Sequence, residues 1–302
     1  MDSTNKYVAW FVNRERQHRG FLKMLAGEVP KRIMLVTAGE GMGKTWLIQR
    51  MYHDCSSQAI PAAKFNFRDG VGRDTLEIVR KARDELGAPH YNLLTQVIND
   101  LTGGRIQVNI DQVAVSVSDS TLQNASITVD DRSGQIVGPV VDRYDVVQVD
   151  NEQMEAMIDA RINDAFFACL KQQTESQRAV FLLDSFEQAQ PEARRWVEEE
   201  LLQRVHDGRL PNLIIIVTSR TAPGFNPNLA DSIAATDLAG FDESHIREYI
   251  ERRDALTILE KHENFIQLVL DINAHNNPEM LARMVDGYML TAKEEDDDDW
   301  LL

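Results

Sequence analysis

The sequence predicts an α/β fold in which a parallel sheet lies between two layers of helices. Two unbroken apolar runs, 179–183 and 213–217, are typical of strands that helices cover on both faces. Segments with the three- and four-residue apolar spacing of helices alternate with the strands. Because strands alternating with helices imply right-handed crossovers, we expect a three-layer parallel-sheet domain.

The elements follow one another in a regular order. An apolar run at 33–37 breaks into glycines and then into a helical pattern, which indicates strand, loop and helix. Gly87 is the stop signal of a later helix. The other expected elements are a strand at 62–67, helices at 76–86, 92–101, 152–171 and 191–205, and the two buried strands.

Two regions interrupt the alternation. Between Gly103 and Asp150 the apolar residues recur every second position, which predicts a β-rich insertion. Their phase shifts across Asp111 and Gln112, which favours a bulge or a turn there. After about Asp237 the pattern is helical only, with expected helices at 244–253, 257–270 and 278–290.

These patterns divide the chain into parts. We expect a sheet domain at 1–236 that carries the insertion at 103–150, a C-terminal helical subdomain at 237–292 and a flexible acidic tail at 293–302. The helical subdomain has one clear helix start, with Asn277 as N-cap and Pro278 at the first helical position.

Composition narrows the class of protein. The chain has 302 residues, 43% of them hydrophobic, and a formal net charge of −16. It has no apolar run of membrane-spanning length and no signal-peptide pattern, so we expect a cytoplasmic protein without a membrane partner. Since the acidic surface repels phosphate backbones, we do not expect a nucleic-acid partner. Cys55 and Cys169 are expected as reduced core residues.

A glycine-rich loop between the first strand and its helix is the sharpest local feature. It fits the phosphate-binding loop of P-loop proteins, except that Ala38 replaces the usual first glycine. Backbone N–H groups of such a loop, together with the helix dipole, bind phosphates. We expect Lys44 to reach the β- and γ-phosphates of a purine nucleoside triphosphate and Thr45 to take one Mg²⁺ position. The expected nucleotide-binding residues here are Gly39, Glu40, Gly41, Met42, Gly43, Lys44, Thr45 and Trp46.

Polar residues follow the two buried strands. Asp184 ends the first of them and is our expected metal-binding acid. Glu187 either orients an attacking water or is an ordinary solvated acid at a helix start. Arg220 follows the second strand and either senses the γ-phosphate or pairs at the surface.

The order of these motifs resembles the STAND family, the signal-transduction ATPases with numerous domains, among the AAA-like P-loop proteins. Residues 11–15, FVNRE, are similar to that family's F-V-G-R-E motif, which implies that Val12 and Arg14 line the adenine pocket. Residues 65–68, FNFR, resemble its second-strand motif, and residues 218–220 match its T-S-R sensor. Pro278 falls where the helical subdomain carries G-x-P and is expected near the nucleotide. The resemblance leaves the insertion unexplained.

The chain departs from the family pattern at several positions. Asn13 and Asn276 replace glycines, and residues 184–188 read DSFEQ where related members often read D-G-L-D-E. Gln188 then replaces the second acid. Because an amide can position water but cannot accept its proton, the resemblance implies slow hydrolysis or binding alone. The candidate catalytic residues are Glu187, Gln188 and Arg220.

The resemblance also implies a setting. STAND proteins usually carry an effector domain and a repeat sensor, and we find no internal repeat here. We therefore expect a switch that binds ATP or ADP with Mg²⁺ and acts with separate proteins, in signal transduction or bacterial defence. The available docking surfaces are the β-insertion and the acidic tail, which ends in Trp300-Leu301-Leu302. Nucleotide-gated oligomerisation, which the family implies, makes a homo-oligomer a further expectation.

Two other functions stay open at this stage. A P-loop kinase or hydrolase for a small molecule would need lid arginines, and Arg194 and Arg195 form the only doublet near the site. A DNA-loading AAA-type ATPase would need a basic DNA-binding module, which the acidic composition disfavours. The sequence does not decide between ATP and GTP.

Overall fold

The structure of this chain is a computed structural model. The residues that it describes are 6–70, 75–101, 108–109, 112–113, 128–129, 136–137, 152–261, 264–272 and 277–298. The chain divides into two compact units, residues 1–86 together with 173–302, and residues 87–172.

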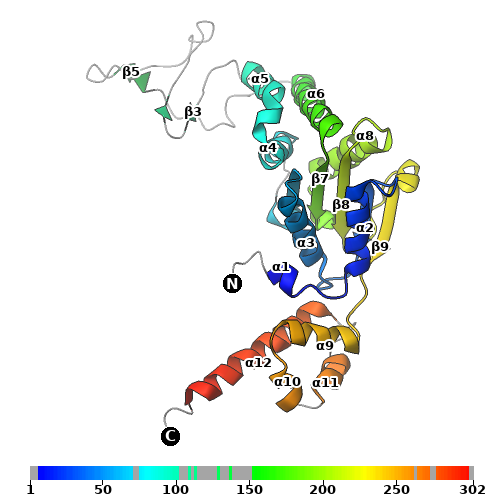
Figure 1. Cartoon of the computed structure of the whole chain (residues 1–302). Helices are drawn as coiled ribbons and strands as arrows, with labels where there is room; N and C mark the ends of the chain where they lie inside the picture. Colours follow the sequence, from blue (N-terminus) through cyan, green and yellow to red (C-terminus); the bar gives the residue numbers. More distant parts are fainter. Residues whose placement is uncertain are drawn as a thin grey trace. The chain divides into compact units, whose positions relative to one another are not determined.

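A five-stranded parallel sheet forms the centre of the first unit, in the order β2-β7-β8-β1-β9 (Figure 1). Both long apolar runs are fully buried strands, which confirms the predicted fold class. The strands are β1 (Ile33–Thr37), β2 (Ala62–Asn66), β7 (Ala179–Asp184), β8 (Leu213–Ser219) and β9 (Ile233–Asp237).

Helices cover the sheet on both faces. On one face, α2 (Glu15–Ala26) and α3 (Lys44–Ser57) bury their apolar sides against β1, β7 and β8. The chain steps one way along the sheet from β1 to β2 and the opposite way from β2 to β8, so right-handed crossovers place the later helices on the other face. These helices include α4 (Thr75–Leu86), α7 (Pro191–Arg195), the π-helical turn η4 (Trp196–Leu202) and α8 (Gln203–His206).

A helical subdomain with its own core follows the sheet in the chain. Its helices are α9 (Glu243–Arg252), α10 (Thr257–Lys261), α11 (Phe265–Ile272) and α12 (Pro278–Asp298). Their apolar faces pack around Ile250, Ile258 and Val269. The prediction of a single helix at 257–270 was wrong, because this segment forms two helices, α10 and α11. Asn264 precedes the start of α11, and its carbonyl accepts from Leu268 N–H at 2.9 Å.

The last helix is longer than expected. Asn277 caps it as predicted, and its side chain accepts from Glu279 N–H at 2.8 Å. The predicted end at Leu290 was wrong, because α12 extends to Asp298 and therefore includes much of the segment expected to be a flexible tail. Ala292, Lys293 and Glu294 are good helix formers, so intrinsic propensity outweighs repulsion between neighbouring acids. Residues 299–302, including Trp300, lie outside the described residues.

The sequence analysis did not predict helix α2 or strand β9. Helix α2 buries Phe21, Met24 and Leu25 at helical spacing, although charged residues surround them. Strand β9 lies at the edge of the sheet and is only partly buried. An edge strand needs no continuous apolar run, so it leaves a weak pattern.

The second unit holds α5 (Asn92–Leu101) and most of α6 (Glu152–Ser176), and the ring of Tyr91 stacks on Phe166 with centroids 5.6 Å apart. Within the predicted insertion, the short strands β3 (Val108–Asn109) and β4 (Gln112–Val113) pair antiparallel. Asp111, in the predicted bulge or turn, lies outside the described residues. Strands β5 (Thr128–Val129) and β6 (Ile136–Val137) also pair antiparallel. The rest of 103–150 lies outside the described residues.

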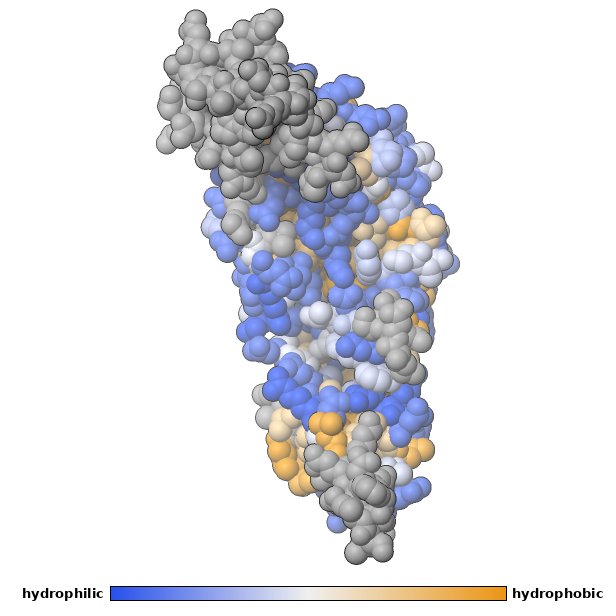
Figure 2. Space-filling view, turned by 90° about the vertical axis from the view of Figure 1, so that its left-hand side faces the viewer, coloured by the Kyte–Doolittle hydropathy of each residue, from blue (hydrophilic) through white to orange (hydrophobic). Residues whose placement is uncertain are grey.

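The face that Figure 2 shows is largely hydrophilic, with apolar side chains gathered over part of the helical subdomain. Large exposed apolar residues there are Leu256, Leu268, Ile272, Met280 and Leu290. Such patches mark contact surfaces in many proteins. No helix among the described residues is both long and apolar enough to cross a membrane.

Removal of the insertion should leave the sheet domain folded, because the described strands of 103–150 pair only with one another and not with the five-stranded sheet. We expect a chain with a short Gly/Ser bridge in place of residues 103–150 to show one cooperative thermal transition. Its affinity for Mg-ATP should match that of the full chain, measured by calorimetry. Loss of cooperative unfolding would mean that the insertion belongs to the core.

Candidate nucleotide-binding site

The glycine-rich loop lies between β1 and α3. Gly41 and Gly43 have φ angles of +71° and +86°, which side chains other than hydrogen adopt only with strain. The φ angle of Ala38 is not positive, and its N–H donates to Ser219 O at 3.1 Å. Alanine therefore fits the first loop position without backbone strain.

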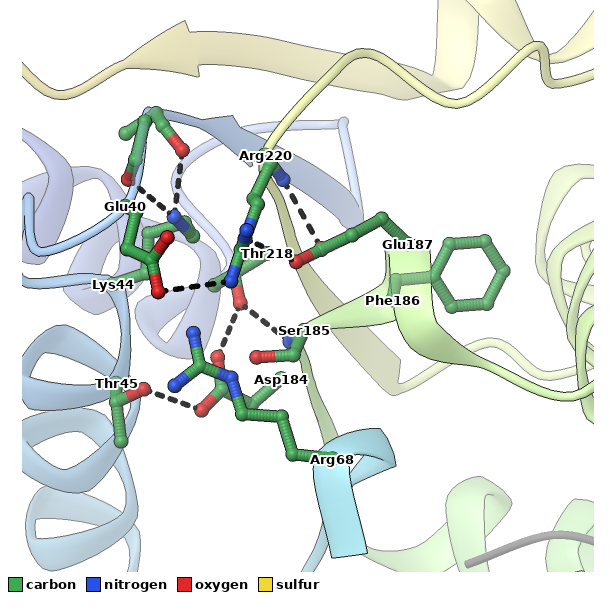
Figure 3. A network of polar contacts seen from close by, with 12 residues as sticks. Glu40, Lys44, Thr45, Arg68, Asp184, Ser185, Phe186, Glu187, Thr218 and Arg220 are labelled. Atoms are coloured by element: carbon green, nitrogen blue, oxygen red, sulfur yellow. Dashed lines mark hydrogen bonds and ion pairs between the residues drawn. The ribbon is translucent and has the colours of Figure 1, made fainter. Parts of the chain in front are cut away.

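Lys44 opens α3 and is 5% exposed. Its ammonium donates to the carbonyls of Ala38 at 2.6 Å and Gly39 at 2.7 Å (Figure 3). Burial lowers the pKa of Lys44, and the nearby carboxylates of Glu187 and Asp184 oppose this effect. The lysine is held inside the loop by two neutral acceptors, which an anion can displace.

Asp184 lies at the end of β7 and is 3% exposed. Its Oδ2 accepts from the Thr45 hydroxyl at 2.7 Å, and its Oδ1 accepts from the Thr218 hydroxyl at 2.6 Å. The sequence-predicted pair Thr45 and Asp184 is therefore in direct contact. A hydroxyl and a carboxylate beside a phosphate-binding loop suit Mg²⁺, which takes few protein ligands and several from phosphate and water.

Arg220 lies between two acids at the end of β8. Its Nε is 3.2 Å from Glu187 Oε1, its backbone N–H donates to Glu187 Oε2 at 3.1 Å, and its guanidinium donates to Glu40 Oε1 at 3.1 Å. Figure 3 shows this chain of contacts beside Lys44. Two predicted catalytic residues, Glu187 and Arg220, thus meet, but they neutralise each other.

A pocket of about 330 Å³ adjoins the loop. Arg14 lines it, is 4% exposed and donates to Met42 O at 2.7 Å, and burial lowers its pKa to about 10 while Glu15 opposes that shift. Its polar end includes Lys44 and Thr45. The predicted nucleotide-binding residues that line it are Val12, Arg14, Gly41, Met42, Gly43, Lys44, Thr45, Trp46 and Pro278.

The helical subdomain contacts the loop directly. Asn277 Nδ2 donates to Glu40 O at 2.9 Å, and Glu279 N–H donates to Gly41 O at 3.2 Å. A Cβ at Gly41 would lie 2.4 Å from the Asn277 side chain, so only glycine fits here. Asn276, the other motif position, lies outside the described residues.

Comparisons with known proteins place no family on the sequence, since it matches no family model and no curated protein. Among solved structures it resembles Cdc6p from Pyrobaculum aerophilum at 12% identity and a TM-score of 0.45, over 88% of this chain and 56% of that one. It also resembles AMPPCP-bound DnaA from Aquifex aeolicus at 11% identity and a TM-score of 0.46, over 94% of this chain and 63% of that one. A third similar structure is domain III of the Thermotoga maritima replication initiation protein DnaA, at 12% identity and a TM-score of 0.47, over 96% of this chain and 90% of that one. The chain thus spans less than two thirds of the length of the Cdc6p chain and of the Aquifex aeolicus DnaA chain.

The decisive features are in the chain itself: a parallel sheet, a glycine loop from β1 into α3, and Thr45 bonded to the acid that ends β7. The chain has a P-loop NTPase fold.

Not every predicted residue of this P-loop site is brought together. Gln188 ends the short 3-10 turn η3 (Phe186–Gln188), is exposed and does not line the pocket. Gly39 and Glu40 also lie outside the pocket lining, although Glu40 holds Arg220. Of the three candidate catalytic residues, only Glu187 and Arg220 are in contact.

Several lining residues were missed. Tyr7 and Trp10 pack against Trp46 with ring centroids 4.9 and 6.3 Å away. Their spacing of three, directly before the FVNRE segment, was an available signal. Phe241 and Tyr249 come from the helical subdomain, and no local pattern marks residues that only the tertiary fold places here.

Two departures from the family motifs fall on left-handed backbone. Asn13 has a φ of +56°, and Ser185 has a φ of +58°. Glycine adopts this region freely and asparagine adopts it more readily than most residues, whereas serine is strained there. Asn13 is also anchored, since its Nδ2 donates to Gly240 O at 3.1 Å. The Ser185 hydroxyl is buried and has no hydrogen-bond partner within the described structure.

Replacement of Ser185 by glycine should stabilise the protein, because glycine relieves the left-handed strain and removes a buried hydroxyl. We expect the free energy of unfolding to rise by about 1 kcal/mol. The matched control is Ser185→Ala, which removes the hydroxyl but keeps the strain. Urea unfolding of the three proteins gives the comparison, and a glycine variant less stable than the alanine variant would contradict the assignment of strain.

Proposed function

We propose that this chain is a STAND-type switch that binds ATP or ADP with Mg²⁺ and acts with separate partner proteins in signalling or bacterial defence. The observation that carries the proposal is the Lys44, Thr45 and Asp184 cluster at the polar end of a pocket that the helical subdomain helps to line. In this proposal Thr45 and Asp184 hold the Mg²⁺, which neutralises phosphate charge when bound.

Nucleotide contacts follow from the same geometry. Phosphates would take the ammonium of Lys44 away from the two loop carbonyls, since a charged acceptor binds an ammonium more strongly than a neutral one. The aromatic wall of Tyr7, Trp10 and Phe241 offers apolar surface to a purine base. Val12, Arg14 and Pro278 complete the wall and are proposed base- or sugar-side contacts.

A switch also needs a route from the nucleotide to the rest of the chain. The loop carbonyls of Glu40 and Gly41 accept hydrogen bonds from Asn277 and Glu279 at the start of α12. Any change of loop shape on nucleotide binding therefore changes contacts of the helical subdomain. Self-association and docking through the β-insertion or the acidic end of the chain stay part of this proposal.

Two alternatives were open from the sequence. The kinase needs lid arginines, and one of the doublet, Arg194, instead stacks on Phe186 and donates to the carbonyls of Phe186 and Glu187. It therefore holds the turn after Asp184. The expectation of no nucleic-acid partner has no support from the comparisons, so a DNA-loading ATPase stays the second candidate. ATP-dependent binding of duplex DNA would favour it.

Substitution of the loop lysine, Lys44, tests nucleotide binding. Calorimetry with Mg-ATP should show saturable binding by the wild type, and Lys44→Ala should weaken it by about 10- to 150-fold, since a charged hydrogen bond to phosphate contributes about 1.5–3 kcal/mol. Lys64→Ala is a suitable control, because this lysine also lies near α3 but outside the pocket. Equal affinity of the Lys44 variant and the wild type would exclude the loop as the binding site.

Hydrolysis should be slow, because Arg220 engages both carboxylate oxygens of Glu187. We expect wild-type turnover below about one per minute, against about ten per second for typical enzymes. Gln188→Glu should leave turnover unchanged, since position 188 is exposed and outside the pocket, and Glu187→Gln should lower it to background. Phosphate release assays measure both. Rapid turnover that survives Glu187→Gln would show that another group is the base.

A further inference from the structure

Lys44, Arg220 and Arg68 are three of the cations at the phosphate-binding loop, and they differ in how they are engaged. Lys44 donates to two loop carbonyls, and Arg220 is paired with Glu187 and Glu40. The side chain of Arg68 makes no hydrogen bond or ion pair with any residue that the structure describes, although its backbone N–H does. Among these three, Arg68 alone has a guanidinium without a protein partner in the described structure.

The backbone of Arg68 is held in place nonetheless. Arg68 belongs to the 3-10 turn η1 (Phe67–Asp69), which begins directly after β2. Asn66 Oδ1 accepts from Arg68 N–H at 3.3 Å, and Asn66 Nδ2 donates to Asp69 Oδ2 at 3.0 Å. Phe67 is buried and packs edge-on against Phe186, with centroids 5.7 Å apart. The turn is therefore fixed by side-chain contacts, while the arginine side chain is exposed.

The side chain of Arg68 extends into the site. Figure 3 shows its guanidinium beside the Thr45 and Asp184 pair, on the side that faces Lys44. Arg68 and Lys44 line the same pocket. Burial is the main cause that lowers the pKa of Lys44, and the positive charges of Arg220 and Arg68 add to it. The two cations are thus close enough to repel, and a shared anion would relieve that repulsion.

Asp184 does not account for this arginine. Each of its carboxylate oxygens already accepts a hydroxyl, from Thr45 and from Thr218. A guanidinium offers a planar set of donors that matches a phosphate group in two-point contact. The position beside the proposed Mg²⁺ ligands is where metal ions of P-loop proteins bridge the outer phosphates.

We propose that Arg68 binds the terminal phosphate of a nucleoside triphosphate and so makes the site prefer triphosphate to diphosphate. This inference rests on the proposed function, because it needs a nucleotide in the pocket. It assigns to Arg68, rather than to the paired Arg220, the first contact with the γ-phosphate. Arg220 can contribute only after it leaves Glu40 and Glu187.

Calorimetry with Mg-ATP and Mg-ADP tests this role in the wild type, Arg68→Ala, Arg68→Lys and the control Arg209→Ala. Arg209 is a surface arginine, 66% exposed, and it lies outside the pocket, so its loss makes the same change of net charge and breaks only an exposed ion pair with Asp207. Arg68→Ala should weaken Mg-ATP binding about tenfold or more and Mg-ADP binding less than about threefold, because one charged contact to the γ-phosphate is lost. Arg68→Lys should give an intermediate affinity for ATP, since it keeps the charge and loses the two-point contact.

Equal weakening of ATP and ADP by Arg68→Ala, or no weakening, would overturn the inference. Thermal unfolding of each variant checks that an exposed side chain was removed without loss of the fold. A different result would refute the proposed function itself, namely a wild type that binds neither Mg-ATP nor Mg-ADP. If the wild type binds both and Lys44→Ala abolishes this binding while Arg68→Ala has no effect, nucleotide binding stands and only the role of Arg68 is refuted.

Discussion

The hydrogen bonds of the Asp184 carboxylate are the constraint on which the rest of the site depends. They join β7 to α3 through Thr45 and to β8 through Thr218, whose hydroxyl in turn accepts from Ser185 N–H at 3.2 Å. A buried carboxylate is costly unless its oxygens are hydrogen-bonded. Here neutral hydroxyls satisfy both oxygens, and no residue in the described structure forms an ion pair with them. The geometry is fixed while the negative charge is left for a cation from outside.

Strong local signals account for what the sequence predicted. Buried strands of a parallel sheet must be apolar throughout, so β7 and β8 were evident, and the loop at β1 is constrained by glycines and by Lys44. Helix starts with a side-chain cap, such as that at Asn277, were also evident. The end of α12 was not, because competing propensity and charge repulsion leave no sharp stop signal.

The rest of the site depends on contacts between distant segments. Phe241 and Tyr249 reach the pocket only because the helical subdomain packs there, and Arg220 meets Glu40 across a separation of 180 residues. Gln188 shows the opposite error. Its place in a motif made it a candidate, but one residue of displacement along a short 3-10 turn leaves it exposed while Glu187 bonds to Arg220.

Departures from a family motif have different physical meanings here. Asn13 and Ser185 keep a left-handed backbone that glycine would adopt at lower cost, and Ala38 does not need that conformation at all. These three changes concern conformation and leave phosphate-binding groups in place. The change at Gln188 removes a possible proton acceptor, but at an exposed position outside the pocket. A count of departures would therefore overstate how far this site has diverged.

The segment before α2 lies in two cores at once. Phe11 is buried in the core of the sheet domain, and Val12, the next residue, is buried in the core of the helical subdomain. Their Cα atoms are only about 3.8 Å apart, as in any trans peptide. The two cores cannot separate at this point unless one side chain is exposed to water, which costs about 1.5–3 kcal/mol. A rigid-body motion between the two cores would therefore have to pivot at this segment, and the cores would separate least here and most far from it.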